Sequence, residues 1–116
     1  LASCVVPARQ VAGGSVITLE ALAPRERHVF AHAFAVAGGV QCGFCTPGML
    51  ISATVLLERN PRPTEDEVRI ALSGNLCRCT GYDGIVKAVL SVAEQPPLGG
   101  KREPDDPSSA RPEGDV

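Results

Sequence analysis

The sequence predicts a mainly α-helical fold, in which four short helices form a small bundle with approximate two-fold symmetry. Three observations predict this fold. Apolar residues recur at helical spacing in four segments, glycine and proline separate those segments, and a helix–cysteine loop–helix pattern occurs twice. The 116 residues are enough for one small domain with short extensions.

Residues 15–20, which read SVITLE, are predicted to form a β-strand ahead of the helices, because their β-branched side chains alternate along the chain. A lone strand cannot bury its faces. We therefore expect this segment to be the remnant of a sheet whose other strands are missing. The chain opens at Leu1 rather than Met, which leads us to expect a truncated N-terminus.

The first helix is expected from about Arg25 to the stop signal at residues 38–39, two glycines. A second helix should begin at Pro47, because proline suits the first helical turn, and should end at residues 60–61, Asn-Pro. Both segments place apolar side chains on one face, as a helix of a bundle requires.

Thr64 and Glu67 form a capping box that should open a third helix, which Gly74 closes. A fourth helix is expected from about Asp83 to Glu94. Tyr82, directly before it, is expected to be a packing residue. Helical hairpins repeated in this way would bring both intervening loops to one end of the bundle.

The chain divides into residues 1–24, a helical unit over residues 25–95, and residues 96–116, which are rich in proline, glycine and serine. Such a composition cannot build a core, so we expect a disordered tail or linker. No run of residues is apolar and long enough to span a membrane, and no signal peptide is recognisable. We expect a cytoplasmic protein with reduced thiols.

The net charge of −2 and the aromatic content of 3% give no footprint for binding nucleic acid. The chemistry of the chain is concentrated in four cysteines, Cys42, Cys45, Cys77 and Cys79, which lie in two glycine-rich loops. Four thiolates can complete the coordination shell of a metal centre. Both loops lead into helix N-termini, which favour an anionic group. Gly43, Gly48, Gly74 and Gly81 are expected to let the backbone approach that group closely.

The spacing of the cysteines leaves two kinds of centre open. An iron–sulfur cluster is favoured, because the surroundings are helical and acidic and the second pair has only one residue between its cysteines. The alternative is a structural zinc site, in which case the chain would be a zinc-binding interaction module without a redox role.

Residues 41–49, QCGFCTPGM, and residues 74–82, GNLCRCTGY, resemble the helical [2Fe–2S] domain of the molybdenum hydroxylases. These enzymes include xanthine oxidase, aldehyde oxidoreductase and carbon monoxide dehydrogenase. The resemblance extends over about residues 3 to 93. It implies an electron-transfer subunit of an oxidoreductase, with no catalytic residue of its own.

The resemblance implies that Cys42, Cys45, Cys77 and Cys79 hold one [2Fe–2S] cluster, and that Gln41 and Cys79 lie against the pterin of the molybdenum cofactor. It further implies that residues 1–24 are the end of a plant-type ferredoxin domain, with Cys4 as an orphaned ligand of a second cluster. The expected partners are a large molybdopterin-binding subunit and a medium FAD-binding subunit. Electrons would pass from molybdenum through both clusters to FAD.

Overall fold

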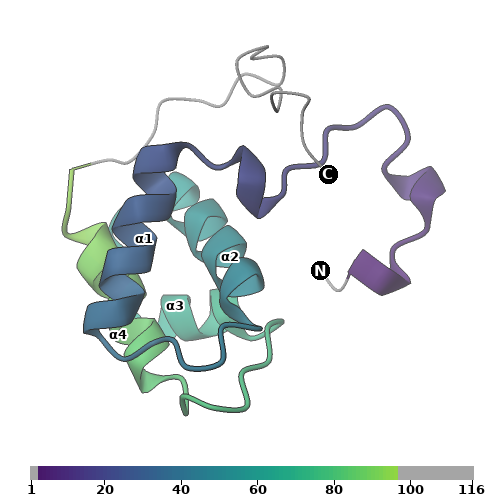
Figure 1. Cartoon of the computed structure of the whole chain (residues 1–116). Helices are drawn as coiled ribbons and strands as arrows, with labels where there is room; N and C mark the ends of the chain where they lie inside the picture. Colours follow the sequence, from purple (N-terminus) through teal and green to yellow (C-terminus); the bar gives the residue numbers. More distant parts are fainter. Residues whose placement is uncertain (1–2, 97–116) are drawn as a thin grey trace, which may run out of the picture.

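The computed structural model describes residues 3–96, within which the chain forms four α-helices and three short 3-10 turns. In chain order, these elements are η1 (Ser3–Val5), η2 (Ala8–Gln10), η3 (Leu19–Ala21), α1 (Pro24–Val36), α2 (Thr46–Arg59), α3 (Glu65–Leu72) and α4 (Asp83–Ala93). Figure 1 shows the helices gathered into one bundle, from which the N-terminal segment extends. The predicted helical fold class is confirmed.

The strand predicted over residues 15–20 is not formed. Residues 3–96 contain no strand, and the last two residues of that segment, Leu19 and Glu20, belong to the turn η3. Its backbone hydrogen bonds are local, from Ala21 N–H to the Thr18 carbonyl at 3.1 Å and from Leu22 N–H to the Leu19 carbonyl at 3.2 Å. A strand needs a partner to receive its ladder bonds, and the described residues supply none. The β-branched pattern is therefore exposed rather than paired.

Local signals set the ends of the first two helices as predicted. Pro24 and Pro47 lie in the first turns of α1 and α2, where a missing N–H breaks no helical hydrogen bond. α1 stops because Gly38 adopts a left-handed φ of 68°, which lets Gly39 N–H reach back to the Phe34 carbonyl at 2.8 Å. These ends fix where the first cysteine loop starts and finishes.

The predicted capping box at the start of α3 is confirmed. The Thr64 hydroxyl accepts a hydrogen bond from Glu67 N–H at 3.3 Å, and the Glu67 carboxylate accepts one from Thr64 N–H at 2.7 Å. α3 ends at Leu72, and α4 starts at Asp83 as expected. The ten residues between these helices carry the second cysteine loop.

The core lies between helices that are distant in sequence. α1 packs mainly on α4, α2 packs on α3, and α3 also packs on α4 (Figure 1). The largest fully buried side chains are Phe30, Phe34, Leu22, Met49, Ile85, Val68, Val89 and Val92. Phe30 and Phe34 meet edge to face with ring centroids 6.5 Å apart. The approximate two-fold symmetry stays a prediction.

The α1–α2 loop and the α3–α4 loop lie at the same end of the bundle (Figure 1). Two glycines bring the end of α1 against the start of α4. A Cβ on Gly84 would lie 2.6 Å from the Ala37 carbonyl oxygen and 2.7 Å from that of Gly38, and one on Gly39 would lie 3.1 Å from the Gly84 oxygen. Such a close approach leaves no room for a Cβ at Gly84 and little room for one at Gly39.

No helix within residues 3–96 combines the length and the apolar character needed to cross a membrane. The tail predicted over residues 96–116 lies outside the described residues from residue 97 onward. The domain boundary predicted at residues 24–25 coincides with the start of α1, and the division into domains stays a prediction.

Candidate metal centre

The four loop cysteines form two pairs, each joining one loop to the other. The Cys79 thiol donates to Cys42 Sγ at 3.5 Å. Cys45 and Cys77 also interact across the loops, since each thiol shifts the pKa of the other. All four are free cysteines. The two loops therefore lie side by side at their cysteines, and the spacing of the cysteines along the chain does not predict which of them pair.

The two pairs differ in their exposure to solvent. Cys42 and Cys79 are exposed at the surface, whereas Cys45 and Cys77 are half-buried and pack against the hydrophobic core. The pairs thus lie one outside the other, from the surface towards the bundle. A group held by all four sulfurs would be anchored inside and accessible from outside.

Each pair combines one thiol of lowered pKa with one of raised pKa. A hydrogen bond from the backbone of Phe44, supported by the Cys79 thiol, lowers the pKa of Cys42, and the bond to Cys42 raises the pKa of Cys79. The Thr80 hydroxyl lowers the pKa of Cys77 to about 7. Burial, followed by the bond to Cys77, raises the pKa of Cys45 to about 11. In each pair one thiol is therefore more acidic than the other, and metal binding must release the protons of both.

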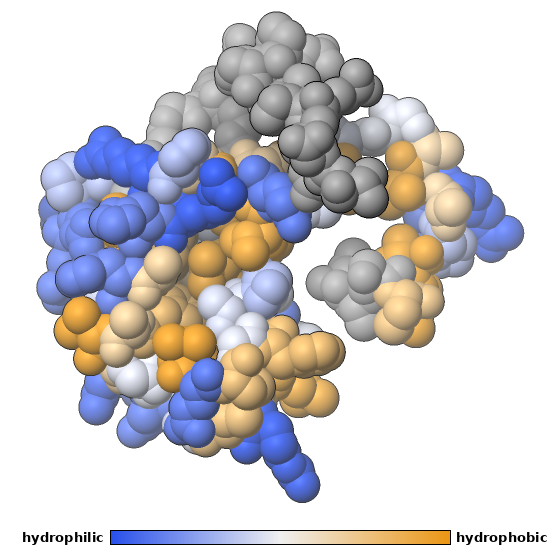
Figure 2. Space-filling view, in the orientation of Figure 1, coloured by the Kyte–Doolittle hydropathy of each residue, from blue (hydrophilic) through white to orange (hydrophobic). Residues whose placement is uncertain are grey.

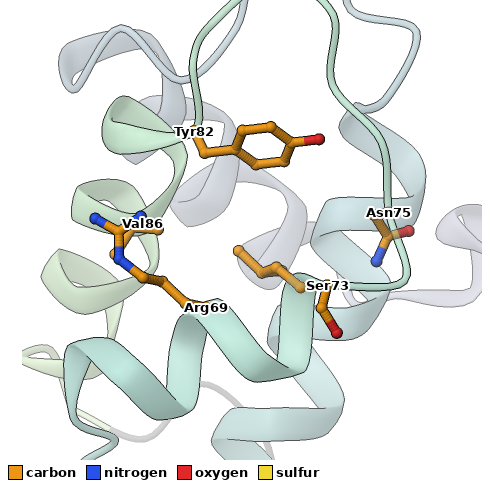
Figure 3. A pocket seen from close by; sticks show the side chains of 6 residues that line it. Arg69, Ser73, Asn75, Tyr82 and Val86 are labelled. Carbon is orange, nitrogen blue, oxygen red and sulfur yellow. The ribbon is translucent and has the colours of Figure 1, made fainter.

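Three hydrogen bonds shape the second loop around Cys77. The Thr80 hydroxyl lies 3.0 Å from Cys77 Sγ, and it accepts from Tyr82 N–H at 3.3 Å. The Tyr82 hydroxyl accepts from Cys77 N–H at 2.8 Å. Figure 3 shows the Tyr82 side chain reaching from the start of α4 across towards the segment that carries Asn75. Tyr82 packs against the core as expected, but its hydroxyl also holds a loop cysteine.

A contact between Asn75 and α2 attaches the second loop to the helix that follows the first loop. Asn75 Nδ2 donates to Ser52 Oγ at 2.7 Å. A Cβ on Gly48 would lie 2.5 Å from Asn75 Oδ1, so the glycine makes room for this amide. Gly48 was expected from the sequence to let the backbone approach a bound group, and no role was predicted for Asn75. The only available signal was that Asn75 precedes the second cysteine pair.

A pocket lies behind the second loop, between α3 and α4 (Figure 3). Its lining residues are Arg69, Leu72, Ser73, Asn75, Tyr82 and Val86. The charge of Arg69 is balanced by Glu65 at 2.7 Å and Asp83 at 3.1 Å. No cysteine lines the pocket, so it is separate from the sulfur pairs.

The remaining predicted site residues lie at the surface. Gln41 is exposed beside Cys42, and Cys4 is exposed in η1. Within residues 3–96, no three His, Cys, Asp or Glu side chains are grouped so that they could hold one metal ion. The sulfurs instead lie in two pairs, Cys42 with Cys79 and Cys45 with Cys77.

Two large apolar side chains are exposed on the tips of the cysteine loops. Phe44 is 94% exposed on the first loop and Leu76 is 86% exposed on the second. Figure 2 shows apolar surface at the end of the molecule where the loops lie. The exposed pair Cys42 and Cys79 is therefore accompanied by apolar surface that the bundle itself does not cover.

A helical domain that gathers two thiol pairs from two loops belongs to the class of domains that bind a thiolate-ligated metal centre. Residues 18–90 match the family described as "[2Fe-2S] binding domain", and the chain belongs to this family. The zinc alternative left open by the sequence has no such support, since the family is an iron–sulfur one.

The relatives are subunits of oxidoreductases. The chain is 46% identical over 94 residues to the nicotinate dehydrogenase small FeS subunit of Eubacterium barkeri, covering 80% of this chain and 60% of that protein. It is 53% identical over 93 residues to the nicotine 6-hydroxylase small subunit of Paenarthrobacter nicotinovorans, covering 80% and 56%. Matches to xanthine dehydrogenases and aldehyde oxidases confirm the family resemblance described above.

The fold is shared with a solved relative. The structure of quinoline 2-oxidoreductase from Pseudomonas putida 86 superimposes with a TM-score of 0.71 at 45% identity, over 81% of this chain and 60% of that one. The chain thus spans 56–60% of the length of the two small subunits and of the solved relative, and 7% of the aldehyde oxidase and of the fungal xanthine dehydrogenase.

Proposed function

We propose that this chain is an electron-transfer subunit of a molybdenum hydroxylase and that Cys42, Cys45, Cys77 and Cys79 hold its [2Fe–2S] cluster. The observation that carries the proposal is the meeting of two thiol pairs from two loops, in a chain that belongs to a [2Fe–2S] binding family. When bound, such a cluster accepts and passes on one electron at a time.

The donor set fits this cluster. Four free thiols match the four thiolates that a [2Fe–2S] centre takes from protein, and their pairing across the loops supports an arrangement with Cys42 and Cys79 on one iron and Cys45 and Cys77 on the other. Cys42 and Cys77, whose pKa values are lowered, give up their protons first. The hydrogen bonds of Thr80 and Tyr82 then keep Cys77 in place.

The exposed side of the site is proposed to face the large molybdopterin-binding subunit. Gln41 and Cys79 would lie against the pterin, as the family resemblance implies, and both are exposed. Phe44 and Leu76 are exposed nearby on the same two loops and offer apolar area for a protein partner. Electrons would enter at the exposed pair of cysteines and leave through the protein.

Beyond this domain, the proposal follows the family resemblance. Electrons would continue to a second cluster, for which Cys4 would be one ligand, and then to FAD on a medium subunit. Cys4 is exposed in η1, in the segment that extends from the bundle (Figure 1). By itself, the chain is expected to bind one cluster.

Anaerobic reconstitution of the chain with iron and sulfide tests the proposal. We expect a brown protein with two irons per chain, as one [2Fe–2S] cluster contains, and visible absorption that bleaches with dithionite. Cys77→Ser should lose or severely destabilise the centre, whereas Cys4→Ser should keep it. A colourless protein with stoichiometric zinc would contradict the proposal, and equal loss in both variants would mean that the ligands are misassigned.

A further inference from the structure

Within residues 3–96, a buried hydroxyl directly after a loop cysteine has no hydrogen-bond partner. Thr46 Oγ1 is a buried side-chain oxygen that makes no hydrogen bond with any of the described residues. Buried polar atoms are nearly always hydrogen-bonded in native proteins, because an unpaired one loses its water without replacement. Thr46 directly follows Cys45 and is the first residue of α2. Its missing partner is therefore to be sought at the metal centre.

The position of Thr46 in the helix removes its usual partner. A threonine inside a helix can donate to the carbonyl four residues back, as Thr54 does to the Leu50 oxygen at 2.9 Å. For Thr46, the residue four back is Cys42, which lies outside the helix in the loop. The hydroxyl is thus buried where the helix cannot satisfy it.

The second cysteine loop has a threonine at the equivalent position, Thr80, and the hydroxyl of this threonine does have hydrogen-bond partners. Thr80 directly follows Cys79, as Thr46 follows Cys45. Thr80 Oγ1 lies 3.0 Å from Cys77 Sγ and accepts from Tyr82 N–H. When Cys77 is a thiolate, the sulfur has no proton, so the Thr80 hydroxyl must be the donor.

We propose that Thr46 and Thr80 are a matched pair of hydroxyl donors to the sulfurs of the redox centre. Thr80 donates to the Cys77 thiolate, and Thr46 donates to a sulfur of the centre that the four thiolates hold. The inference rests on the proposed function. Hydrogen bonds to sulfur stabilise the more negative, reduced form of an iron–sulfur centre. Both threonines therefore raise its reduction potential.

The test measures the reduction potential of the reconstituted chain by a dye-mediated redox titration. Thr46→Val and Thr80→Val remove a hydroxyl at nearly constant volume, and we expect each to lower the potential and the double variant to lower it further. Thr54→Val makes the same change in the same helix as Thr46, away from the cysteines, and should leave the potential at the wild-type value. Thr46→Ser keeps the hydroxyl and should also retain that value.

Each outcome decides the inference. A wild-type potential in either valine variant would overturn the matched pair, as would an equal shift in Thr54→Val. If Thr46→Val does not bind the cluster, the result for Thr46→Ser decides the role of the hydroxyl. A Thr46→Ser protein that binds the cluster and has the wild-type potential supports a donor hydroxyl, and one that does not bind the cluster contradicts it. If wild-type protein forms no [2Fe–2S] centre, the proposed function itself fails, which is distinct from a centre whose potential ignores both threonines.

Discussion

At Tyr82 the backbone adopts a left-handed conformation with φ of 72°, the one such non-glycine residue within residues 3–96. This conformation is unfavourable for a side chain as large as tyrosine. It orients Tyr82 so that its hydroxyl accepts from Cys77 N–H at 2.8 Å, while its own N–H donates to Thr80. The strained residue thus closes a hydrogen-bonded ring around a cysteine proposed to bind iron.

Tyr82→Phe should weaken the second loop without altering the bundle. The ring is kept, so its packing against the core remains, but Cys77 N–H loses its acceptor. Leaving such a donor unpaired costs about 1–3 kcal/mol. We expect a lower free energy of unfolding by about this amount, measured in urea, and faster bleaching of the reconstituted centre in air. Wild-type bleaching would show that the loop does not depend on this bond.

The sequence was enough to single out the four loop cysteines as the candidate site, but it did not predict the residues that surround them. Their spacing alone pointed to a shared centre, because cysteine pairs at such spacing are typical of metal sites. The Tyr82 hydroxyl and the Asn75 amide were not predictable, since each depends on how the second loop folds back on its neighbours. A sequence pattern carries no information about that path.

At the scale of elements, the short helix α3 depends on its first turn. It has eight residues, with Glu65, Asp66 and Glu67 at the positive end of its dipole. The Glu67 carboxylate accepts from both the N–H and the hydroxyl of Thr64, at 2.7 and 2.9 Å. An isolated helix of this length would be marginal, so its cap contributes to keeping the second loop in place.

The capping box should make stability depend on pH in mildly acidic solution. The hydrogen bonds from Thr64 lower the pKa of Glu67 in the folded state, relative to about 4.3 in an unfolded chain. The stabilisation is therefore complete above the unfolded value and is lost as the pH falls through the folded one. We expect the urea midpoint to fall between about pH 5 and pH 3, and to fall less in Glu67→Gln.

Asp66→Asn is the matched control for this prediction, because it removes the same charge from the same helical turn outside the capping box. It should keep the fall in midpoint that wild type shows. If the urea midpoints of Glu67→Gln and Asp66→Asn depend on pH in the same way, the pH dependence comes from the general negative charge near the start of α3 rather than from the capping box.

The helices were predictable to within about one residue at most of their ends, because caps, prolines and glycines act locally. The segment over residues 15–20 was not, since its alternation of β-branched residues specifies a strand only where another strand is available to pair with it. Local sequence patterns therefore predicted the helices, whose backbone hydrogen bonds lie within one segment. They failed for the strand, whose hydrogen bonds need a second segment.

At the scale of the whole molecule, the two helix–cysteine loop–helix units, α1 with α2 and α3 with α4, meet where α1 ends and α4 begins. Four loop glycines were expected to let the backbone approach a bound group, whereas the tightest backbone approach is that of Gly84 to Ala37 and Gly38. Which helices pair is a property of the tertiary fold, and the helical spacing of apolar residues does not reveal it. This contact sets how near the first cysteine loop lies to the second.

Gly84→Ala should separate the two loops. The new Cβ would lie 2.6–2.7 Å from backbone atoms of Ala37 and Gly38, which cannot move aside as a flexible side chain would. Alanine gains about 1 kcal/mol in helix propensity over glycine, but overpacking typically costs about 1–3 kcal/mol. We therefore expect a net loss of stability in urea and a smaller fraction of chains that load a cluster, because α4 must shift away from α1 and take its cysteine loop with it.

Gly74→Ala provides the matched control, since it makes the same change beside the same loop where a Cβ would meet no atom within 4 Å and the φ angle is not left-handed. It should load like wild type, and the smaller freedom of its unfolded chain should leave its stability equal or slightly higher. Equal loading by Gly84→Ala and Gly74→Ala would show that the glycine contact does not control the approach of the loops. Poor loading by Gly84→Ala alone would show that the distance between the sulfur pairs is set by the packing of α1 on α4, at some remove from the cysteines themselves.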